Sequence, residues 1–225
     1  MIKSVLITKE LFEVPLLEKF CAKNKMDLIA NSFIRFSLVQ AEIPVNIEAV
    51  FFGSKRAVEF FLLQSDLPVS CKVACIGETT KNYIENLGIE VDFCGSKAGD
   101  PEFVAQELKE WLGKRKLHIA LSDQSNRSMS KLLPEYQVDE FIVYQTISDP
   151  KPMPDAPDLI IFTSPSNLNG FLVENQISSR SKVIAWGKTT EKALNAVNIH
   201  PDLVLQQATE SELIEILQKG FINHP

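Results

Sequence analysis

The chain of 225 residues contains an internal repeat at a constant offset of 110 residues. Residues 51–62 read FFGSKRAVEFFL and residues 161–172 read IFTSPSNLNGFL, while residues 73–80 read VACIGETT and residues 183–190 read VIAWGKTT. Similar apolar strands alone would not explain the shared serine, glycine and paired threonines. Because self-similarity at a fixed offset is typical of a duplicated unit, the sequence predicts two copies of one fold, each of ordinary domain size.

Each copy alternates short β-branched apolar runs with segments whose apolar residues recur at helical spacing. Strands are predicted at residues 5–8, 49–52, 72–76, 117–121, 159–162 and 182–186. Helices are predicted near residues 12–23, 55–64, 79–87, 101–112, 165–174, 189–197 and 210–219. This alternation predicts an α/β fold with two similar lobes, each with a parallel sheet flanked by helices. Extended segments near 27–37 and 138–147 occupy equivalent places in the copies and are candidate connector strands between the lobes.

Composition excludes several classes of function. A net charge of −6 disfavours non-specific nucleic-acid binding, which needs a basic surface. The chain has no apolar run of about eighteen residues to cross a membrane, and its N-terminus lacks a signal peptide, so a cytoplasmic location is expected. In that compartment the cysteines should be reduced, and Cys71 and Cys75 lack the further ligands that a zinc site requires.

The repeated motifs place a small residue where a strand ends and a helix begins. Ser164 suits the N-cap position and Pro165 the first helical position, and Ser54 is the equivalent of Ser164. Gly77 and Gly187 each end a strand, and each precedes a pair of threonines that opens the next helix. Serine and threonine are also ordinary helix caps, so each position taken singly has a purely structural explanation.

The number and placement of these four helix starts favour a binding role, because they form two matched pairs at the carboxyl ends of parallel strands. Open α/β sheets bind ligands at that edge. Helix N-termini present free N–H groups and a positive dipole end, which suit carboxylates or phosphates. Neither a G-x-G-x-x-G nor a G-x-x-x-x-G-K-[ST] pattern occurs, so a nucleotide has no specific support. The sequence therefore predicts a site for an anionic ligand.

An F-[TS]-S-x-x-[AG]-[VL] segment followed by a G-x-x-T helix start, occurring twice with a V-Y-x-T strand between the copies, resembles the uroporphyrinogen-III synthase family. The matching pieces are Phe52–Val58, Gly77–Thr80, Val143–Thr146, Phe162–Leu168 and Gly187–Thr190. The resemblance covers essentially the whole chain. It implies a fold in which the two lobes exchange their first units across a pair of linker strands.

On this expectation residues 1–33 join residues 151–225 in one lobe, residues 37–145 form the other, and the connectors lie near 34–37 and 146–150. The family's substrate is hydroxymethylbilane, a linear tetrapyrrole with acetate and propionate arms, expected to bind between the lobes. The implied reaction loses the terminal hydroxyl as water, inverts the last ring through a spiro intermediate and closes uroporphyrinogen III. The resemblance thus implies a monomeric cyclising hydro-lyase of porphyrin and heme biosynthesis that uses neither cofactor nor metal.

Tyr144 matches the tyrosine of the V-Y-x-T strand and is the candidate catalytic residue. A phenol with a pKa of about 10 is neutral at pH 7 and can donate a hydrogen bond to the departing hydroxyl, although β propensity alone would also explain a tyrosine there. By the same resemblance, the candidate substrate-binding residues are Ser54, Lys55, Gly77, Thr79, Thr80, Thr163, Ser164, Ser166, Gly187, Thr189 and Thr190. His118, His200 and His224 are assigned no role.

A negative net charge is unfavourable for binding a polyanionic substrate. Backbone N–H groups at several helix starts can hold carboxylates without arginines, which removes this difficulty. Solvated basic side chains near the motifs can add steering, namely Lys55, Arg56, Arg127 and Lys188.

Three stretches depart from the family pattern. Thr8-Lys9-Glu10 stands where many members carry Thr-Arg-Pro, Gly53 stands in place of threonine, and Leu121–Arg127 replaces a glycine-containing loop. Asp123 within that loop would repel a carboxylate. An alternative function is therefore a non-catalytic two-lobed relative that binds an anionic ligand. A two-lobed solute-binding protein is a further alternative, which the missing signal peptide disfavours.

Overall fold

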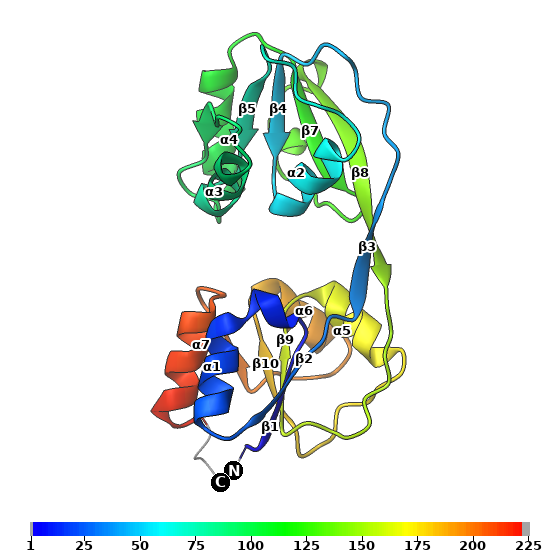
Figure 1. Ribbon diagram of the computed structural model, residues 1–225, viewed down its shortest axis with the longest axis vertical. Coiled ribbons are helices and arrows are strands. Elements are labelled where there is room, and N and C mark those ends of the chain that lie inside the picture. The colour runs from blue at the N-terminus through cyan, green and yellow to red at the C-terminus, as the bar shows by residue number, and fades with distance from the viewer. Residues whose placement is uncertain (1, 222–225) are drawn as a thin grey trace. The chain divides into compact units, whose positions relative to one another are not determined.

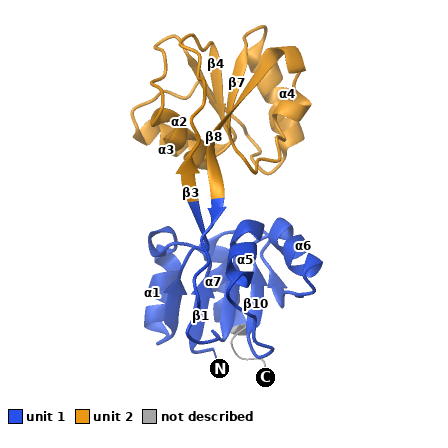
Figure 2. Ribbon diagram, turned by 90° about the vertical axis from the view of Figure 1, so that its right-hand side faces the viewer, with its two compact units in different colours: residues 1–35, 147–225 blue, residues 36–146 orange. Residues whose placement is uncertain are grey.

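The computed structural model describes residues 2–221 and forms two compact units. Unit 1 comprises residues 1–35 and 147–225, and unit 2 comprises residues 36–146 (Figure 2). Each unit has its own β-sheet with helices on both faces, which confirms the predicted fold class.

The sheet of unit 1 has the strand order β11-β10-β9-β1-β2, and all of its pairings are parallel. Its strands are β1 (Ser4–Ile7), β2 (Asp27–Ala30), β9 (Leu159–Phe162), β10 (Lys182–Ala185) and β11 (Leu203–Val204). One face is covered by α1 (Pro15–Lys23) and α7 (Glu210–Ile216), the other by α5 (Pro165–Leu172) and α6 (Lys188–Ala196) (Figure 1). A 3-10 turn, η1 (Leu11–Glu13), precedes α1, and a π turn (Leu217–Phe221) follows α7.

The sheet of unit 2 has the order β3-β8-β7-β4-β5-β6. Its strands are β3 (Ile34–Leu38), β4 (Ala49–Phe52), β5 (Lys72–Cys75), β6 (Phe93–Cys94), β7 (Leu117–Ser122) and β8 (Val138–Ser148). Helices α2 (Lys55–Leu62) and α3 (Glu78–Asn86) pack on one face. Helix α4 (Pro101–Leu112) packs on the other, and the 3-10 turns η2 (Ser130–Leu132) and η3 (Glu135–Gln137) lead into β8.

The central strands are apolar along their whole length because helices cover both faces of each sheet. All four residues of β4, AVFF, are buried, and so are all four residues of β9, LIIF. These two strands are the equivalent positions of the two copies, so the repeat in sequence corresponds to the two sheet centres.

The offset of 110 residues recurs in the hydrogen bonds. Asp92 accepts a hydrogen bond from the backbone N–H of Val73 at 2.8 Å, and Asp202 accepts one from that of Val183 at 2.7 Å. Each aspartate lies just before the edge strand and ties it to the neighbouring strand. Polar contacts as well as apolar patterning are therefore duplicated.

The first strand of the chain is bound to a segment about 155 residues away. β1 lies between β9 and β2, and the Asp158 carboxylate accepts hydrogen bonds from the N–H groups of Lys3 at 2.7 Å and Ser4 at 3.0 Å. At the equivalent position of unit 2, the Glu48 carboxylate accepts from the N–H of Lys116 at 2.7 Å, just before β7. The start of β1 is thus held by residues of the second copy.

The prediction of one extended connector over residues 27–37 is wrong. Residues 27–30 form β2 and pair with β1, whereas β3 begins at Ile34 and belongs to the other sheet. Between them, the Asn167 side chain accepts a hydrogen bond from the N–H of Phe33 at 2.8 Å. This contact with a distant helix interrupts the strand, and periodicity cannot reveal it. The two-residue strands β6 and β11 were also not predicted, because they are too short to have a period.

Among the residues that the structure describes, none of the helices has the length and apolar character that a membrane crossing requires. Within the same residues no three His, Cys, Asp or Glu side chains gather as metal ligands would. The cysteines are free thiols, and burial raises the pKa of Cys21 and Cys71 to about 11 and that of Cys75 to about 12. These thiols stay protonated at neutral pH and act as small apolar side chains.

Asp158→Asn is expected to destabilise unit 1 by about 1–2 kcal/mol at neutral pH, because two N–H groups lose a charged acceptor. The hydrogen bond from the N–H of Lys3 lowers the pKa of Asp158, as do those from the N–H and the hydroxyl of Ser4. A carboxylate with a lowered pKa stabilises the fold above its unfolded pKa of about 3.9, and this contribution is lost as the pH falls through the folded value. Urea unfolding should be measured at several pH values from neutral to strongly acid. The free energy of unfolding should fall less toward acid pH in the variant than in the parent.

Asp155→Asn is the matched control, because Asp155 is exposed in the same loop. It should leave both the free energy of unfolding and its pH dependence unchanged. Identical acid profiles for the Asp158 variant and the parent would contradict the role of this carboxylate.

Candidate active site

Two helix starts lie side by side at the carboxyl edge of the sheet of unit 2. Ser54 follows β4 and is the N-cap of α2, and Gly77 follows β5 and is the N-cap of α3. β4 and β5 are paired neighbours, with Phe52 opposite Cys75, so the two helices begin at adjacent positions. Thr79 is exposed in the first turn of α3, and Thr80 is only 5% exposed.

Unit 1 repeats this arrangement. Ser164 follows β9 and caps α5, and Gly187 follows β10 and caps α6. Their strands are paired, with Phe162 opposite Ala185. Thr189 is exposed, and the next residue, Thr190, is 3% exposed. Within each unit, the structure thus brings the helix starts identified from the sequence together as a pair.

The hydroxyl hydrogens of the two cap serines have no acceptor among residues 2–221 and can be donated to a ligand. The hydroxyl of Ser54 accepts from the N–H of Ala57 at 3.2 Å, and that of Ser164 accepts from the N–H of Asn167 at 3.2 Å. A serine hydroxyl can accept at its oxygen and donate its own hydrogen at the same time. Lys55 begins α2, with its ammonium 5.9 Å from the centre of the Tyr83 ring. Ser166, half-buried, is in the first turn of α5.

Thr163 differs from the other predicted binding residues because its hydroxyl already donates a hydrogen bond within the fold. Its N–H donates to the Thr8 hydroxyl oxygen at 2.9 Å, and its own hydroxyl donates to the Thr8 carbonyl at 2.7 Å. Thr8 is fully buried at the end of β1. The pair ties the carboxyl ends of β1 and β9 together. Sequence reasoning missed Thr8 as its partner, because no local pattern connects residues this far apart.

The two glycine caps differ in how much room they have. A Cβ atom on Gly77 would lie 2.6 Å from the Cβ of Ala98, whereas one on Gly187 would meet nothing within 4 Å. The backbone of both glycines is extended, so strain is not the reason for glycine at either position. Close approach of the loop that contains Ala98 requires glycine at position 77, while the start of α6 has open space beside Gly187.

Gly77→Ala is expected to lower the melting temperature by several degrees, and Gly187→Ala is expected to leave it unchanged. In the first variant the new methyl group forces Ala98 and its loop to move, a form of overpacking that typically costs about 1–3 kcal/mol. Thermal unfolding of both variants checks this directly. Equal melting temperatures for the two variants would contradict the close packing inferred at Gly77.

Tyr144 is on β8, with its ring held by aromatic neighbours. The ring stacks on Phe60 of α2 with centroids 5.2 Å apart, and it meets Phe36 edge-on at 5.9 Å. The guanidinium of Arg56 lies 3.8 Å from the centre of the Phe36 ring. Packing on two sides fixes the direction in which the phenol points. Sequence reasoning did not identify Phe36 or Phe60, which are ordinary apolar residues in any local window.

Three buried side chains, those of Thr80, Tyr144 and Thr190, keep a hydroxyl open to solvent. Tyr144 is 9% exposed, and none of the three hydroxyls has a hydrogen-bond partner among residues 2–221. Within that range His118 Nδ1 is the one side-chain polar atom that is both sealed and unpartnered. The three hydroxyls are therefore not sealed from solvent. Fixed groups of this kind can donate to a carboxylate or to a departing hydroxyl without prior rearrangement.

The basic side chains near the helix starts are only partly available to attract an anionic ligand. Arg127 is paired with Glu140, with Nε 3.3 Å from a carboxylate oxygen, so its steering charge is partly compensated. Lys188 is exposed at the start of α6. Lys9 lies over the ring of Trp186, 5.0 Å from its centre, at the carboxyl ends of β1 and β10. Sequence reasoning missed this pair, although Trp186 stands where the first copy has Ile76 and could have indicated it.

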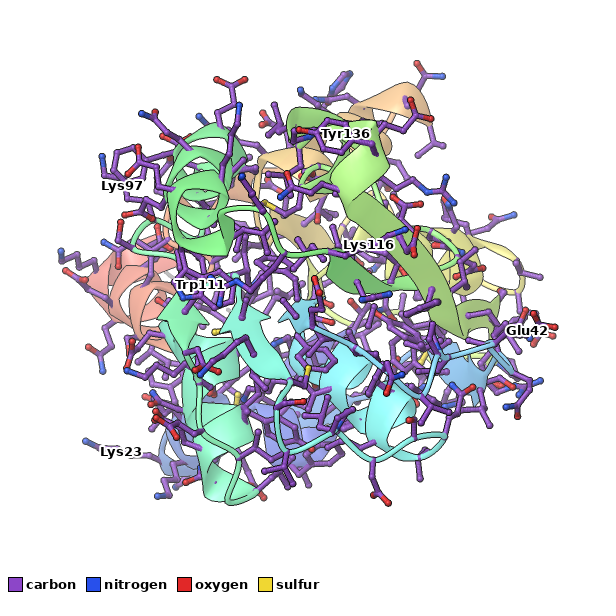
Figure 3. The ribbon with its side chains drawn as sticks, turned by 90° about the horizontal axis from the view of Figure 1, so that it is seen from above. Lys23, Glu42, Lys97, Trp111, Lys116 and Tyr136 are labelled. Carbon is purple, nitrogen blue, oxygen red and sulfur yellow. The ribbon has the colours of Figure 1, made fainter. Side chains whose placement is uncertain are left out.

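His118 and His200 lie apart from the helix starts. His118 is buried in the first half of β7, where burial lowers its pKa, and it stacks on Phe141. His200 is exposed, with Nδ1 2.8 Å from Asn195 Oδ1, and His224 lies outside the described residues. Figure 3 labels Lys116, which precedes β7, and Tyr136, which precedes β8, so both belong to the amino-terminal edge of that sheet.

The family model described as uroporphyrinogen-III synthase HemD matches residues 12–215. A crystal structure of uroporphyrinogen-III synthetase from Helicobacter pylori aligns with a TM-score of 0.72 at 18% identity, covering 96% of this chain and 99% of that one. A mutant uroporphyrinogen III synthase from Thermus thermophilus aligns with a TM-score of 0.58 at 15% identity, covering 96% and 99%. At these identities the structures show the shared fold. A comparison with curated proteins finds no significant match.

Proposed function

Because this chain belongs to the uroporphyrinogen-III synthase family, we propose that it closes hydroxymethylbilane to uroporphyrinogen III at the four helix starts that follow β4, β5, β9 and β10. The members of the family are cyclising hydro-lyases of tetrapyrrole biosynthesis, and this chain acts as one of them. The family match over residues 12–215 includes all four helix starts.

The observation that carries the assignment of the site is the set of open hydroxyls on buried side chains, together with the helix N-termini. The substrate carries an acetate and a propionate arm on each pyrrole ring. Backbone N–H groups at the starts of α2, α3, α5 and α6 bind these carboxylates, assisted by the hydroxyls of Ser54, Thr80, Ser164 and Thr190. Binding spread over many weak contacts suits a flexible chain that must rearrange while it is bound.

Tyr144 is the proposed catalytic residue. Its phenol donates a hydrogen bond to the terminal hydroxyl of the substrate, which leaves as water with the proton it needs. The carbon that loses the hydroxyl is then attacked by the last ring at the ring carbon that already carries the link to the third ring, which gives the spiro intermediate. That link breaks and re-forms at the other α-carbon of the last ring, so the ring is inverted. The ring carbon that closes the macrocycle gives up a proton at the end, so one water is lost overall. Phe60 and Phe36 hold the phenol in place for this step.

We further propose that the enzyme works as a monomer in the cytoplasm. Residues 1–33 with 151–225 and residues 37–145 act as its two lobes, with extended connectors near 34–37 and 146–150.

A non-catalytic relative that binds an anionic ligand is the alternative, and one observation favours it. The Asp123 side chain is exposed at the end of β7, where it accepts from the N–H groups of Gln124 at 2.9 Å and Thr146 at 3.0 Å. Its fixed negative charge stands in the loop where the family pattern has a glycine. Repulsion there would weaken binding of a carboxylate-rich substrate.

A coupled assay with freshly generated hydroxymethylbilane decides between the two. The uncatalysed reaction yields the symmetric type I isomer, so the isomer ratio of the product reports the enzyme directly. We expect the type III isomer to predominate. Only type I product at high protein concentration would overturn the proposed activity, and tight binding of uroporphyrin without turnover would then support the non-catalytic alternative.

A further inference from the structure

Unit 2 contains a cavity of about 260 Å³ that the helix starts do not use. It lies beside the carboxyl edge of the sheet, on the face that packs against α4. Phe51 of β4 and Ile119 and Leu121 of β7 form its apolar floor. The loop at residues 125–130 also lines it. All of its lining residues belong to unit 2.

The cavity also has a polar side with one cation, Arg127, which pairs with Glu140 at 3.3 Å. Ser125, Arg127, Ser128 and Ser130 line it. Arg127 has a φ of 53°, a left-handed conformation that favours glycine. Its N–H donates to Ser125 Oγ at 3.1 Å, and the Ser130 hydroxyl beside it donates to the Glu140 carboxylate. The loop thus holds an arginine in a strained conformation at the mouth of an apolar cavity, and strain of this kind is concentrated at functional sites.

Gly53 keeps the cavity open. It lines the cavity at the end of β4, and the equivalent residue of the second copy is Thr163. A Cβ atom at position 53 would meet only Phe51, at 4.0 Å, and the backbone there is not left-handed. Neither crowding nor strain therefore requires glycine at this position. What the missing side chain provides is space.

We propose that this cavity binds one carboxylate-bearing pyrrole ring of the substrate. The ring lies against Phe51, Ile119 and Leu121, and its carboxylate takes the place of Glu140 at Arg127, beside Ser125 and Ser128. Small-molecule pockets usually enclose about 300–1,000 Å³, so this cavity accommodates one ring and not four. A ring held under the loop cannot turn over, so it is one of those that keep their orientation. The inference rests on the proposed function and adds residues outside the helix starts.

Porphobilinogen, a monopyrrole with one acetate and one propionate arm, is the probe. Met129 lines the cavity, is 6% exposed, and carries a methyl group that a pyrrole ring current would shift in an NMR spectrum. With the methionine methyl groups labelled, titration should shift the resonance of Met129, assigned through Met129→Leu. The resonances of Met26 and Met153, both in unit 1, should not move. Pyrrole without acid arms and acetate alone should each bind at least about tenfold more weakly.

Two substitutions test the two halves of the proposed contact. Arg127→Gly removes the cation and relieves the strained backbone, so affinity for the probe should fall about fivefold or more while the melting temperature is kept. Gly53→Leu fills the cavity and should abolish the shift of Met129. Gly53→Thr is the milder variant, because it introduces the residue that the second copy already has, and it should weaken binding without harming the fold.

Lys25→Gly is the matched control for the arginine variant. Lys25 is exposed in unit 1 with a φ of 55°, so this change also replaces a basic residue by glycine in a left-handed conformation. It should likewise keep the melting temperature, and it should leave the shift of Met129 unchanged. Porphobilinogen that leaves Met129 unshifted, or that binds Gly53→Leu and Arg127→Gly as it binds the parent, would overturn the proposal.

The isomer assay separates this inference from the proposed function. If the parent protein forms type III product, Gly53→Leu should raise the KM for hydroxymethylbilane at least about tenfold. If Gly53→Leu and Arg127→Gly both have the KM of the parent, the cavity is not part of the substrate site, while the proposed activity is unaffected. If the parent forms no type III product, the proposed function fails, and the shift of Met129 still decides whether the cavity binds a pyrrole.

Discussion

Tyr144→Phe is expected to lower the rate of type III formation by about a hundred- to ten-thousand-fold, the usual worth of general-acid assistance. The change removes one donor and leaves the ring in place, stacked on Phe60 and edge-on to Phe36. Because the Tyr144 hydroxyl has no partner among residues 2–221, its removal breaks no contact of the described fold. The loss should therefore appear in kcat, with little change in melting temperature.

Two variants make this result interpretable. Thr190→Ala removes a binding hydroxyl but leaves the backbone N–H groups, so it should cost on the order of tenfold, the worth of one neutral hydrogen bond near 1 kcal/mol. Tyr136→Phe is the matched control, because Tyr136 is 83% exposed at the amino-terminal edge of the sheet (Figure 3), and it should change nothing. If Tyr144→Phe were fully active and Thr190→Ala inactive, the catalytic role would belong to the start of α6 and not to Tyr144.

Gly170→Ala is expected to destabilise unit 1 by at least about 1–3 kcal/mol, although alanine normally favours a helix over glycine by about 1 kcal/mol. A Cβ atom at this position in α5 would lie 2.1 Å from the carbonyl oxygen of Phe33 and 3.0 Å from its Cβ. Phe33 is fully buried and packs edge-on against Phe171 at 5.2 Å, so it cannot move away without disturbing the core. The sign of the effect is thus the reverse of helix propensity.

Urea unfolding followed by the fluorescence of Trp186 in a Trp111→Phe background checks this in unit 1 alone, because Trp111 belongs to unit 2. Gly187→Ala is the control, since a methyl group there meets nothing within 4 Å. A stabilised Gly170→Ala variant would mean that α5 does not pack against the backbone of Phe33 as the structure describes.

Local chemistry accounts for what could be predicted without the structure. The boundaries predicted for α4, at residues 101–112, and for β4, at residues 49–52, agree with the observed ones. Proline at the first helical position and an apolar run closed by turn residues act within a few neighbours along the chain. The same is true of the two serine caps and the two glycine caps, which is why four helix starts of the candidate site could be named in advance.

Contacts between distant residues account for the rest. No local window connects Thr163 with Thr8, so the engagement of its hydroxyl became known only from the structure. Asn167 interrupts the strand before Ile34 in the same way. The missing side chain at Gly53 creates a cavity only because Phe51, Ile119 and the loop at residues 125–130 surround it.

The sequence by itself determined the duplication, the α/β class and the places where helices begin, because propensity, capping and periodicity are properties of neighbouring residues. Through its resemblance, it also indicated the family. Tertiary structure alone decided which hydroxyls are used within the fold and which remain open, and where the sheet of unit 2 leaves room for a ring. These properties depend on the side chains that pack around a group, and packing brings together residues that are far apart in the chain.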